Sequence, residues 1–275
     1  MTTKADVAII GCGEAGIFSG YELKLRHPEL NIIVLEQGAD IYSRKCPIVA
    51  GKVKSCIHCK TCDTMCGFGG AGAFSDGKFN FTTQFGGWLT EYMEPEEVME
   101  LIEYVDSINV AHGATTERFS TSTPEARALE IEALKYDLHL LQAQCKHLGT
   151  ERNLQILTNI YEDLKNKIEY RFHTSVTKIE VDGDGYRLTT ESDGDFTCRY
   201  LIAAPGRSGA EWFASQCKDL GIKLINNQVD IGVRVELPAK VFEHITNVVY
   251  ESKLIYRTKQ YGDQVRTFCM NPYGH

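Results

Sequence analysis

The stretch DVAIIGCGEAG constrains the fold of this chain more than any other. Its apolar residues 7–10 predict a strand, and glycines with the spacing G-x-G-x-x-G follow, with a helix expected from Glu14. In such a turn Gly11 makes the tight bend, Gly13 lets a pyrophosphate approach the backbone, and Gly16 lets helix and strand pack closely. The N-terminus of the helix then offers free N–H groups to phosphate.

A second apolar strand, residues 31–35, ends in Glu36, followed by Gln37. An acid about twenty residues after the glycines is expected to bind the ribose hydroxyls of an adenine dinucleotide. The order of strand, glycines, helix, strand and acid therefore favours a dinucleotide site over a glycine-rich turn without a ligand. The stretch GFGGAG at 67–72 has the same glycine spacing, but it follows no strand, so we do not interpret it as a second turn of this kind.

Four cysteines lie within eleven residues, and a fifth precedes a proline upstream. A C-x2-C-x2-C-x3-C run is typical of bacterial ferredoxins. It predicts one [4Fe–4S] cluster with three ligands from the run and either Cys46 or Cys66 as the fourth. Zinc is the alternative metal, although it prefers two separated Cys pairs, and reduced loop cysteines without a metal are a third interpretation. The candidate metal ligands are Cys46, Cys56, Cys59, Cys62 and Cys66.

Composition excludes several classes of protein. With 275 residues and 43% apolar content, the chain can bury a sizeable core. No apolar run is long enough to span a membrane, and the first ten residues read as a strand rather than as a secretory signal. A cytoplasmic location is expected, where thiols stay reduced. The net charge of -8 argues against nucleic acid as a partner.

The second half of the chain has the alternating pattern of β-structure. Residues 170–206 alternate apolar and polar side chains between Asp-Gly turns, which predicts a β-meander. The last strand of the meander is apolar and stops at Pro205 and Gly206. Further on, VDIGVRVEL at 229–237 has an apolar residue at every second position and predicts another strand.

The segments GCGEAG, VLEQG, HTSVTKIE and LIAAPG resemble the FAD-binding domain of the glutathione-reductase-like flavoproteins. The segments RKCP, GFGGAGAFSDGK, KHLGTERN, DIGVRVE and VRTFC narrow the resemblance to a family of uncharacterised FAD-dependent dehydrogenases, distantly similar to fumarate-reductase and geranylgeranyl-reductase flavoproteins. The resemblance covers nearly all of the chain. It implies an α/β fold with a Rossmann-like three-layer FAD/NAD(P)-binding domain, a β-meander, and an antiparallel β-rich substrate portion.

The resemblance also assigns residues to the cofactor. It implies that Val176 lies against adenine, that the turn from Ala204 to Gly206 passes near FAD, and that Arg44 faces the pyrophosphate. It places the segment GGAGAFSDGK beside the cofactor as well. The residues of that segment expected to contact FAD are Gly70, Gly72 and Ser75.

The expected domain organisation follows from these assignments. Residues 1–226 form the dinucleotide-binding domain, with a cysteine-rich insertion at 46–66, and residues 227–275 begin a β-rich substrate domain. Related flavoproteins close their cofactor site with a Gly-Asp strand and a helix, which the 69 residues after Gly206 do not contain. A chain truncated at its C-terminus is therefore expected.

The expected function is that of an FAD-dependent oxidoreductase that moves electrons between a small organic substrate and a carrier through the adjacent cluster. The carrier would be a one-electron protein or NAD(P)H. One alternative is an NAD(P)-dependent dehydrogenase with structural zinc, and another is a non-catalytic redox or binding protein. No catalytic residue is assigned; Lys78, Arg234 and Arg266 are candidates for holding an anionic substrate, and His147 is a weaker candidate for the active site.

Overall fold

The computed structural model describes residues 2–271, and the chain divides into two compact units. Unit 1 contains residues 1–76 and 149–228, and unit 2 contains residues 77–148 and 229–275. The expected boundary at 226 lies close to the third change of unit, between residues 228 and 229, but residues 77–148 differ from expectation because they belong to unit 2. The reason is that their strands pair with one another and with a strand of the C-terminal segment. No helix among the described residues combines the length and the apolar composition that a bilayer span requires.

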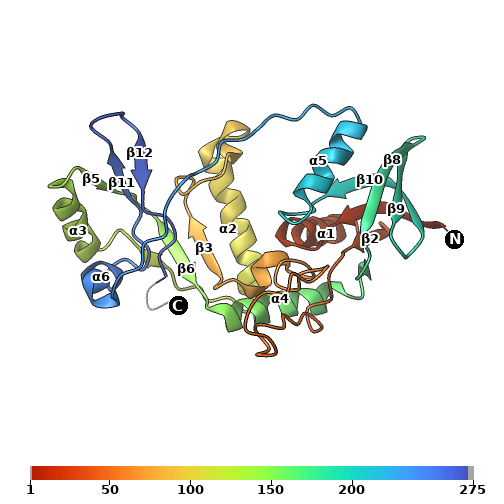
Figure 1. The fold of residues 1–275 in the computed structure, drawn as a ribbon, viewed down its shortest axis with the longest axis horizontal. Coiled ribbons are helices and arrows are strands. Elements are labelled where there is room, and N and C mark those ends of the chain that lie inside the picture. The colour runs from red at the N-terminus through yellow and green to blue at the C-terminus, as the bar shows by residue number, and fades with distance from the viewer. Residues whose placement is uncertain (1, 272–275) are drawn as a thin grey trace. The chain divides into compact units, whose positions relative to one another are not determined.

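Unit 1 is built on a six-stranded mixed sheet with strand order β7-β2-β1-β10-β9-β8 (Figure 1). Its elements are β1 Thr2–Ile10, α1 Glu14–Arg26, β2 Ile32–Leu35, the 3-10 helix η1 Gly70–Phe74, α4 Thr150–Leu164, β7 Glu169–Arg171, β8 Val176–Asp182, β9 Gly185–Thr190, β10 Asp195–Ala203 and α5 Ala210–Asp219.

The centre of this sheet is β1, which runs parallel to β2 on one side and to β10 on the other. Its residues 7–10 are all buried, because side chains on both faces of the strand are covered. On one face α1 approaches so closely that a Cβ at Gly20 would lie 3.7 Å from the Cδ1 of Ile9. On the other face Trp212 and Leu220, at the two ends of α5, pack against the core around Phe196. Burial on both faces explains why the strand is continuously apolar.

The β-meander predicted from the alternating pattern is present. Strands β8 and β9 pair antiparallel, and β9 pairs antiparallel with β10. Gly183 and Gly194 have positive φ angles of 61° and 77°, which suits the two Asp-Gly turns. The last strand then runs parallel to β1, so the meander joins the sheet at its centre.

Unit 2 contains two three-stranded antiparallel sheets, with strand orders β12-β11-β5 and β3-β6-β4. Its elements are β3 Lys78–Phe81, the 3-10 helix η2 Leu89–Glu91, α2 Pro95–Ala111, β4 Phe119–Ser120, α3 Pro124–Leu134, β5 Leu138–Leu140, β6 Gln144–His147, α6 Ala239–Thr246, β11 Leu254–Arg257 and β12 Gln264–Arg266.

The strand predicted at 229–237 is absent, and this corrects the sequence analysis. These residues belong to neither a helix nor a strand, and all nine are exposed. The alternating pattern is that of a strand, but a strand also needs a neighbour to bond with, and no described part of the chain lies beside this segment as one. After residue 227 the described chain forms one helix, α6, and two short strands, β11 and β12, so the expected β-rich character is not observed there.

Candidate functional site

The first glycine of the turn lies where β1 ends, at a point where a side chain cannot fit. Gly11 has a φ angle of +94°, and a Cβ atom on it would lie 2.2 Å from the carbonyl oxygen of Ala204. Two hydrogen bonds fix this approach, from the N–H of Gly11 to the oxygen of Leu35 (2.9 Å) and from the N–H of Ala204 to the oxygen of Ile10 (2.8 Å). Both the backbone conformation and the close contact require glycine here.

The other two glycines of the turn differ in their surroundings. A Cβ on Gly16 would lie 2.1 Å from the carbonyl oxygen of Gly11, so this glycine lets α1 approach β1. A Cβ on Gly13 would meet only the Cα of Gly70, at the ordinary contact distance of 3.9 Å. No described protein atom requires a glycine at 13, whereas a phosphate group approaching the start of α1 would require one.

The acid at the end of β2 is buried and bound by backbone amides. Only 5% of Glu36 is exposed. Its Oε2 atom accepts a hydrogen bond from the N–H of Cys12 (2.8 Å), and its Oε1 atom accepts from the N–H groups of Gly38 (2.7 Å) and Gly67 (2.9 Å). A carboxylate has about four acceptor positions, so these three hydrogen bonds leave one position on Oε2.

The glycine loop that begins at Gly67 lies directly against the turn. The N–H of Gly69 donates to the carbonyl oxygen of Cys12 (2.8 Å). Gly70 has a φ angle of +53°, and a Cβ on it would lie 3.0 Å from the Cα of Gly13. The loop and the turn are therefore adjacent backbone segments, and the contact of Gly70 with a cofactor stays a prediction.

Gly72 lies between two polar side chains. Asn153 of α4 donates a hydrogen bond from Nδ2 to the carbonyl oxygen of Gly72 (2.7 Å). A Cβ on Gly72 would lie 2.8 Å from Oε1 of Glu14. Glu14 is an exposed residue, yet its carboxyl group lies against Gly72, and desolvation raises its pKa to about 7. Ser75 is exposed, and its N–H donates to the oxygen of Gly72 (3.0 Å).

Arg44 holds the loop between the cysteines and the glycines. Its guanidinium group is buried and donates to the carbonyl oxygens of Asp63 (2.9 Å), Thr64 (3.1 Å) and Phe68 (2.6 Å). It also lies over the ring of Phe74, 4.8 Å from the centroid. In the described chain, Arg44 thus fixes loop structure, and its contact with a pyrophosphate stays a prediction.

Gln37 follows the acid and contacts two other loops of unit 1. Its Nε2 atom lies 3.2 Å from Sγ of Cys66 and 3.3 Å from Oγ of Ser208. The turn after β10 continues through Gly206, which has a φ angle of +64°. The side chain of Gln37 therefore connects the end of β2 with the loop that follows the meander.

A shallow cavity of about 380 Å³ lies beside the predicted adenine contact. It is lined by residues 170–174, 192 and 193, just before Val176, which begins β8 and is half-buried. This segment is bonded to the acid, because Thr174 N–H donates to the oxygen of Glu36 (2.8 Å) and Glu36 N–H donates to the oxygen of Arg171 (2.9 Å). The cavity is large enough for a purine ring.

The cysteines do not form a metal site. Cys56, Cys59 and Cys62 are exposed, Cys46 is half-buried, and the buried Cys66 contacts Gln37 and Ser208 instead of other thiols. Among residues 2–271 no three His, Cys, Asp or Glu side chains come together as metal ligands. The arrangement therefore does not fit a [4Fe–4S] cluster or zinc, each of which needs several converging ligands. The prediction of a metal centre is not supported.

One thiol of this set has a distinct environment. Hydrogen bonds from the backbone N–H of Val49 and Ile48 and from Thr64 hold the pKa of Cys46 below its usual value. Cys12, in contrast, is fully buried in the glycine turn, and burial raises its pKa well above the usual range. Cys12 therefore stays protonated and acts as a small apolar residue.

Unit 2 brings two of the suggested polar residues together. Lys78 and His147 are directly opposite in the β3–β6 pair, so their side chains lie on one face of that sheet. The ammonium group of Lys78 contacts the carboxylate of Glu251, and the hydroxyl of Tyr250 lies 3.0 Å from Nε2 of His147. This face joins two pairs of titratable groups and is a candidate place for a small-molecule substrate.

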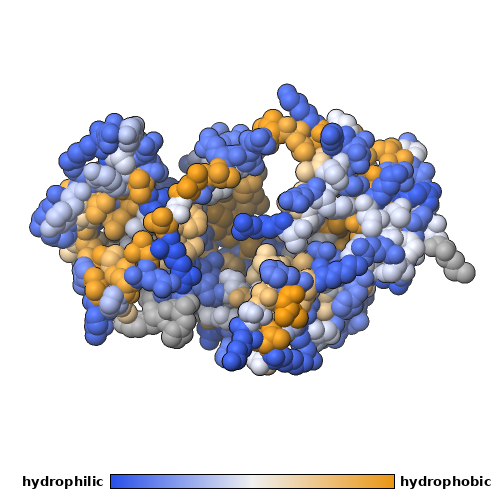
Figure 2. All heavy atoms as spheres, viewed as in Figure 1, coloured by the Kyte–Doolittle hydropathy of each residue, from blue (hydrophilic) through white to orange (hydrophobic). Residues whose placement is uncertain are grey.

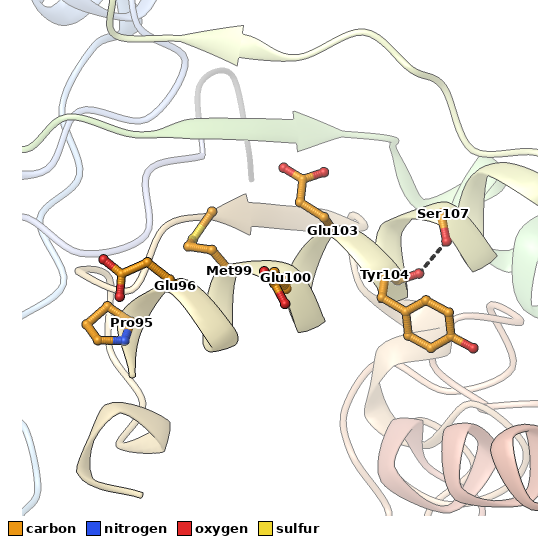
Figure 3. Close-up of a pocket in the computed structure, with 7 residues that line it drawn as sticks. All are labelled: Pro95, Glu96, Met99, Glu100, Glu103, Tyr104 and Ser107. Atoms are coloured by element: carbon orange, nitrogen blue, oxygen red, sulfur yellow. Dashed lines mark hydrogen bonds between the residues drawn. The ribbon is translucent and has the colours of Figure 1, made fainter. Parts of the chain in front are cut away.

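A larger hollow, of about 730 Å³, lies along one side of α2 (Figure 3). Three carboxylates, a methionine and a tyrosine line it, and the hydroxyl of Ser107 donates to the carbonyl oxygen of Tyr104 (2.6 Å). None of the residues assigned to a cofactor lines this hollow, so we do not identify it as the dinucleotide site.

The sequence did not reveal the contacts that hold Glu36 in place. The N–H groups of Cys12, Gly38 and Gly67 come from three separate loops. A Cβ on Gly38 would lie 2.3 Å from the nitrogen of Gly67. The glycine at position 38 was therefore the signal that could have indicated the close approach of the loop at Gly67 to the end of β2. Asn153 was also missed, since an asparagine in a helix carries no pattern of its own.

Comparisons with known proteins give a limited result. No family model matches the chain. A curated protein of Clostridium beijerinckii, described as uncharacterized, is 25% identical over 281 residues, which cover 98% of this chain and 45% of that protein. The chain thus spans about half the length of the curated relative it matches.

Solved structures share part of the backbone arrangement. L-amino acid deaminase from Proteus vulgaris matches with a TM-score of 0.47 and 13% identity over 81% of this chain and 51% of that one. Glycine oxidase from Geobacillus kaustophilus matches with a TM-score of 0.46 and 16% identity over 81% of this chain and 60% of that one. At this level of likeness the solved structures carry no argument about function.

Proposed function

We propose that the glycine turn of unit 1 binds the ADP half of FAD, and that the chain acts as an FAD-dependent oxidoreductase on a small organic substrate. The observation that carries this proposal is Gly13. It stands at the N-terminus of α1 with no described protein neighbour that requires a glycine, close to a buried carboxylate with one acceptor position left. A diphosphate and the ribose attached to it account for both features.

Each part of the site has a role in this proposal. The N–H groups at the start of α1 bind the diphosphate, where the helix dipole favours negative charge. Glu36 accepts a hydrogen bond from a ribose hydroxyl, and the cavity at 170–174 receives the adenine ring. FAD, when bound, supplies hydride and single-electron transfer. Arg44 keeps the loop that carries Gly70 in position through its three hydrogen bonds to carbonyl oxygens.

The choice of FAD over NAD(P) rests on the β-meander and the glycine loop. Both belong to the segments through which the chain resembles FAD-binding domains, and the meander joins the sheet beside β1. The face of unit 2 that carries Lys78 and His147 is the proposed place of a small-molecule substrate, where the ammonium group of Lys78 is already paired with Glu251. Electrons would pass to or from a one-electron carrier or NAD(P)H, which belongs to the same proposal.

The variant Gly13→Ala tests the proposal. Gly13 has a φ angle of -79°, which alanine adopts without strain, so the free energy of unfolding should stay within about 0.5 kcal/mol of the wild type. The added methyl group would occupy the space assigned to phosphate, so the affinity for FAD should fall at least about tenfold. Isothermal titration of the apo-protein with FAD, and then with NAD+, measures both affinities.

Gly16→Ala is the matched control, because its Cβ would collide with backbone at 2.1 Å and should reduce stability as well as binding. Equal FAD affinity for Gly13→Ala and the wild type would contradict the proposed site. Tighter binding of NAD+ than of FAD would instead support the NAD(P)-dependent dehydrogenase.

A further inference from the structure

Residues 229–237 present a row of apolar side chains to solvent. Val229 is 80% exposed, Ile231 95% and Val233 88%. Hydrophobic residues are visible in Figure 2 along the path that the chain takes between α5 and α6 in Figure 1. Single exposed apolar residues are common on proteins, but a continuous row of them marks an interaction site or a site of aggregation.

The segment does not have the composition of a linker. Flexible linkers are rich in glycine and serine, and stiff ones in proline, whereas Val, Ile, Val, Val and Leu stand here at alternate positions. Residues 222–238, which lead from unit 1 into unit 2, contain no helix or strand. No backbone group of residues 223–237 is hydrogen-bonded to another backbone group of the described chain. The segment is a strand sequence without a pairing partner among the described residues.

In an extended strand, the charged residues Asp230, Arg234 and Glu236 lie on the face opposite the apolar side chains. Their charges make the segment complementary to a second copy of itself. In an antiparallel pair of two copies centred on Gly232, Asp230 of each copy stands opposite Arg234 of the other. The same register sets Ile231 opposite Val233, which keeps apolar residues together on one face. Opposite charges and β-branched residues directly across a strand pair stabilise it. A register centred one residue later would set Asp230 opposite Glu236, two like charges.

We propose that residues 229–235 pair antiparallel with the same residues of a second copy of this chain, so that two copies form a symmetric dimer. Such an interface uses one surface patch twice, and a segment complementary to itself meets that requirement. The pairing gives each strand the backbone hydrogen bonds that it lacks in one copy.

The existing contacts of the charged residues do not prevent this pairing. Asp230 lies 3.1 Å from Arg266, and Arg234 lies 2.7 Å from Glu236. Arg234 and Glu236 are both 74% exposed, and Asp230 is 81% exposed. Arg266 is only 22% exposed. The exposed pair of Arg234 and Glu236 contributes little to stability, so exchanging it for a pair across an interface costs little.

The test is sedimentation velocity of the full chain at protein concentrations from about 1 to 200 µM, where dimers increase by mass action. The wild type should shift from monomer to dimer over this range. Asp230→Arg and Arg234→Asp, each alone, set like charges across both ends of the pair and should weaken self-association at least tenfold. An equimolar mixture of the two variants restores opposite charges and should associate as the wild type does.

Lys223→Asp is the matched control, because it reverses an exposed charge outside the paired residues and should leave association unchanged. A wild type that stays monomeric throughout, single variants that dimerise normally, or a mixture that does not associate would each overturn the proposal. FAD titration of the same samples keeps this outcome separate from the proposed function, since the segment contains none of the residues assigned to FAD.

Discussion

Two loops of unit 1 carry short motifs that predict a cofactor, and the structure supports only one of them. In the glycine turn, residues 11–16, the backbone of Ala204 closes on Gly11, the backbone of Gly11 closes on Gly16, and the position of Gly13 stays open. In the cysteine run, residues 56–62, the thiols are exposed and no other ligand from the described residues approaches them. The comparison teaches that the spacing of a motif indicates a binding site only where the surrounding strands, helices and loops also orient the residues of that motif.

The physical reason lies in what each ligand needs. A diphosphate needs only backbone N–H groups at the start of a helix, and a strand–turn–helix unit fixes such groups by itself. A metal ion or an iron–sulfur cluster needs four ligand atoms that converge in space. The turn obtains its geometry from the sheet, whereas the cysteine run connects two segments of loop and has no strand or helix to orient its thiols.

The largest expected difference between the two loops is in the free energy of unfolding that is lost when a glycine is replaced by a residue with a side chain. Gly11→Val would drive a Cβ to 2.2 Å from the oxygen of Ala204 at a φ angle of +94°. The free energy of unfolding should fall by at least about 3 kcal/mol, measured by urea unfolding. Gly51→Ala, near the cysteine run, also has a positive φ angle but no atom within 4 Å of its Cβ, so it should cost only about 1 kcal/mol. Equal losses would break the comparison.

Arg44 connects the two loops, and its removal should have the next largest effect. Arg44→Leu would leave three carbonyl oxygens, two of them in residues 63–64, without their donor. Unsatisfied groups of this kind should reduce the free energy of unfolding by about 2 kcal/mol. Lys45→Leu, at the exposed neighbouring position, is the control and should stay within about 0.5 kcal/mol of the wild type. A harmless Arg44→Leu would mean that the loop does not depend on these bonds.

The glycine turn could be predicted from the sequence because its parts are close along the chain. Residues 7–36 supply the strand, the glycines, the helix and the acid, and local preferences fix their order. The meander was predictable for the same reason, since Gly183 and Gly194 mark turns between neighbouring strands.

The remaining features depend on contacts between distant residues. Gly67 reaches Glu36 across 31 residues, and Asn153 reaches Gly72 across 81. The place of residues 77–148 in unit 2 and the absence of a strand at 229–237 are decided by which segments pair, and alternation along the chain does not specify a pairing partner.

A smaller, pH-dependent effect is expected at Glu14, the first residue of α1. Burial raises the pKa of this carboxyl group from its ordinary value of 4.5 to about 7 in the folded chain. The folded state therefore holds a proton that the unfolded state releases between these values, so stability from this group is present below pH 4.5 and lost as pH rises through 7.

Glu14→Gln removes this dependence. The variant should unfold at a higher temperature than the wild type at about pH 8, by about 2 °C, and at the same temperature at about pH 4, measured by differential scanning calorimetry. Glu22→Gln, on the same helix, is the control for loss of a charge. A difference that is constant with pH would show that Glu14 ionises in the folded chain as it does in the unfolded one.

The smallest effect is expected in the cysteine run. Replacing Cys56, Cys59 and Cys62 together by serine should change the free energy of unfolding by less than about 0.5 kcal/mol, because these side chains are exposed. FAD affinity should stay within about twofold of the wild type. Iron analysis of anaerobically purified wild type should find far less than the iron of one cluster per chain. Stoichiometric iron that the triple variant loses would restore the rejected prediction.

The most direct test of the central claim is an amide ¹H–¹⁵N spectrum of the apo-protein titrated with FAD. If the glycine turn is the site, the amide resonances of Gly13, Glu14 and Gly70 shift on binding, and those of Cys56, Cys59 and Cys62 do not. Shifts confined to the cysteine run, or no shifts with excess FAD, would contradict the account.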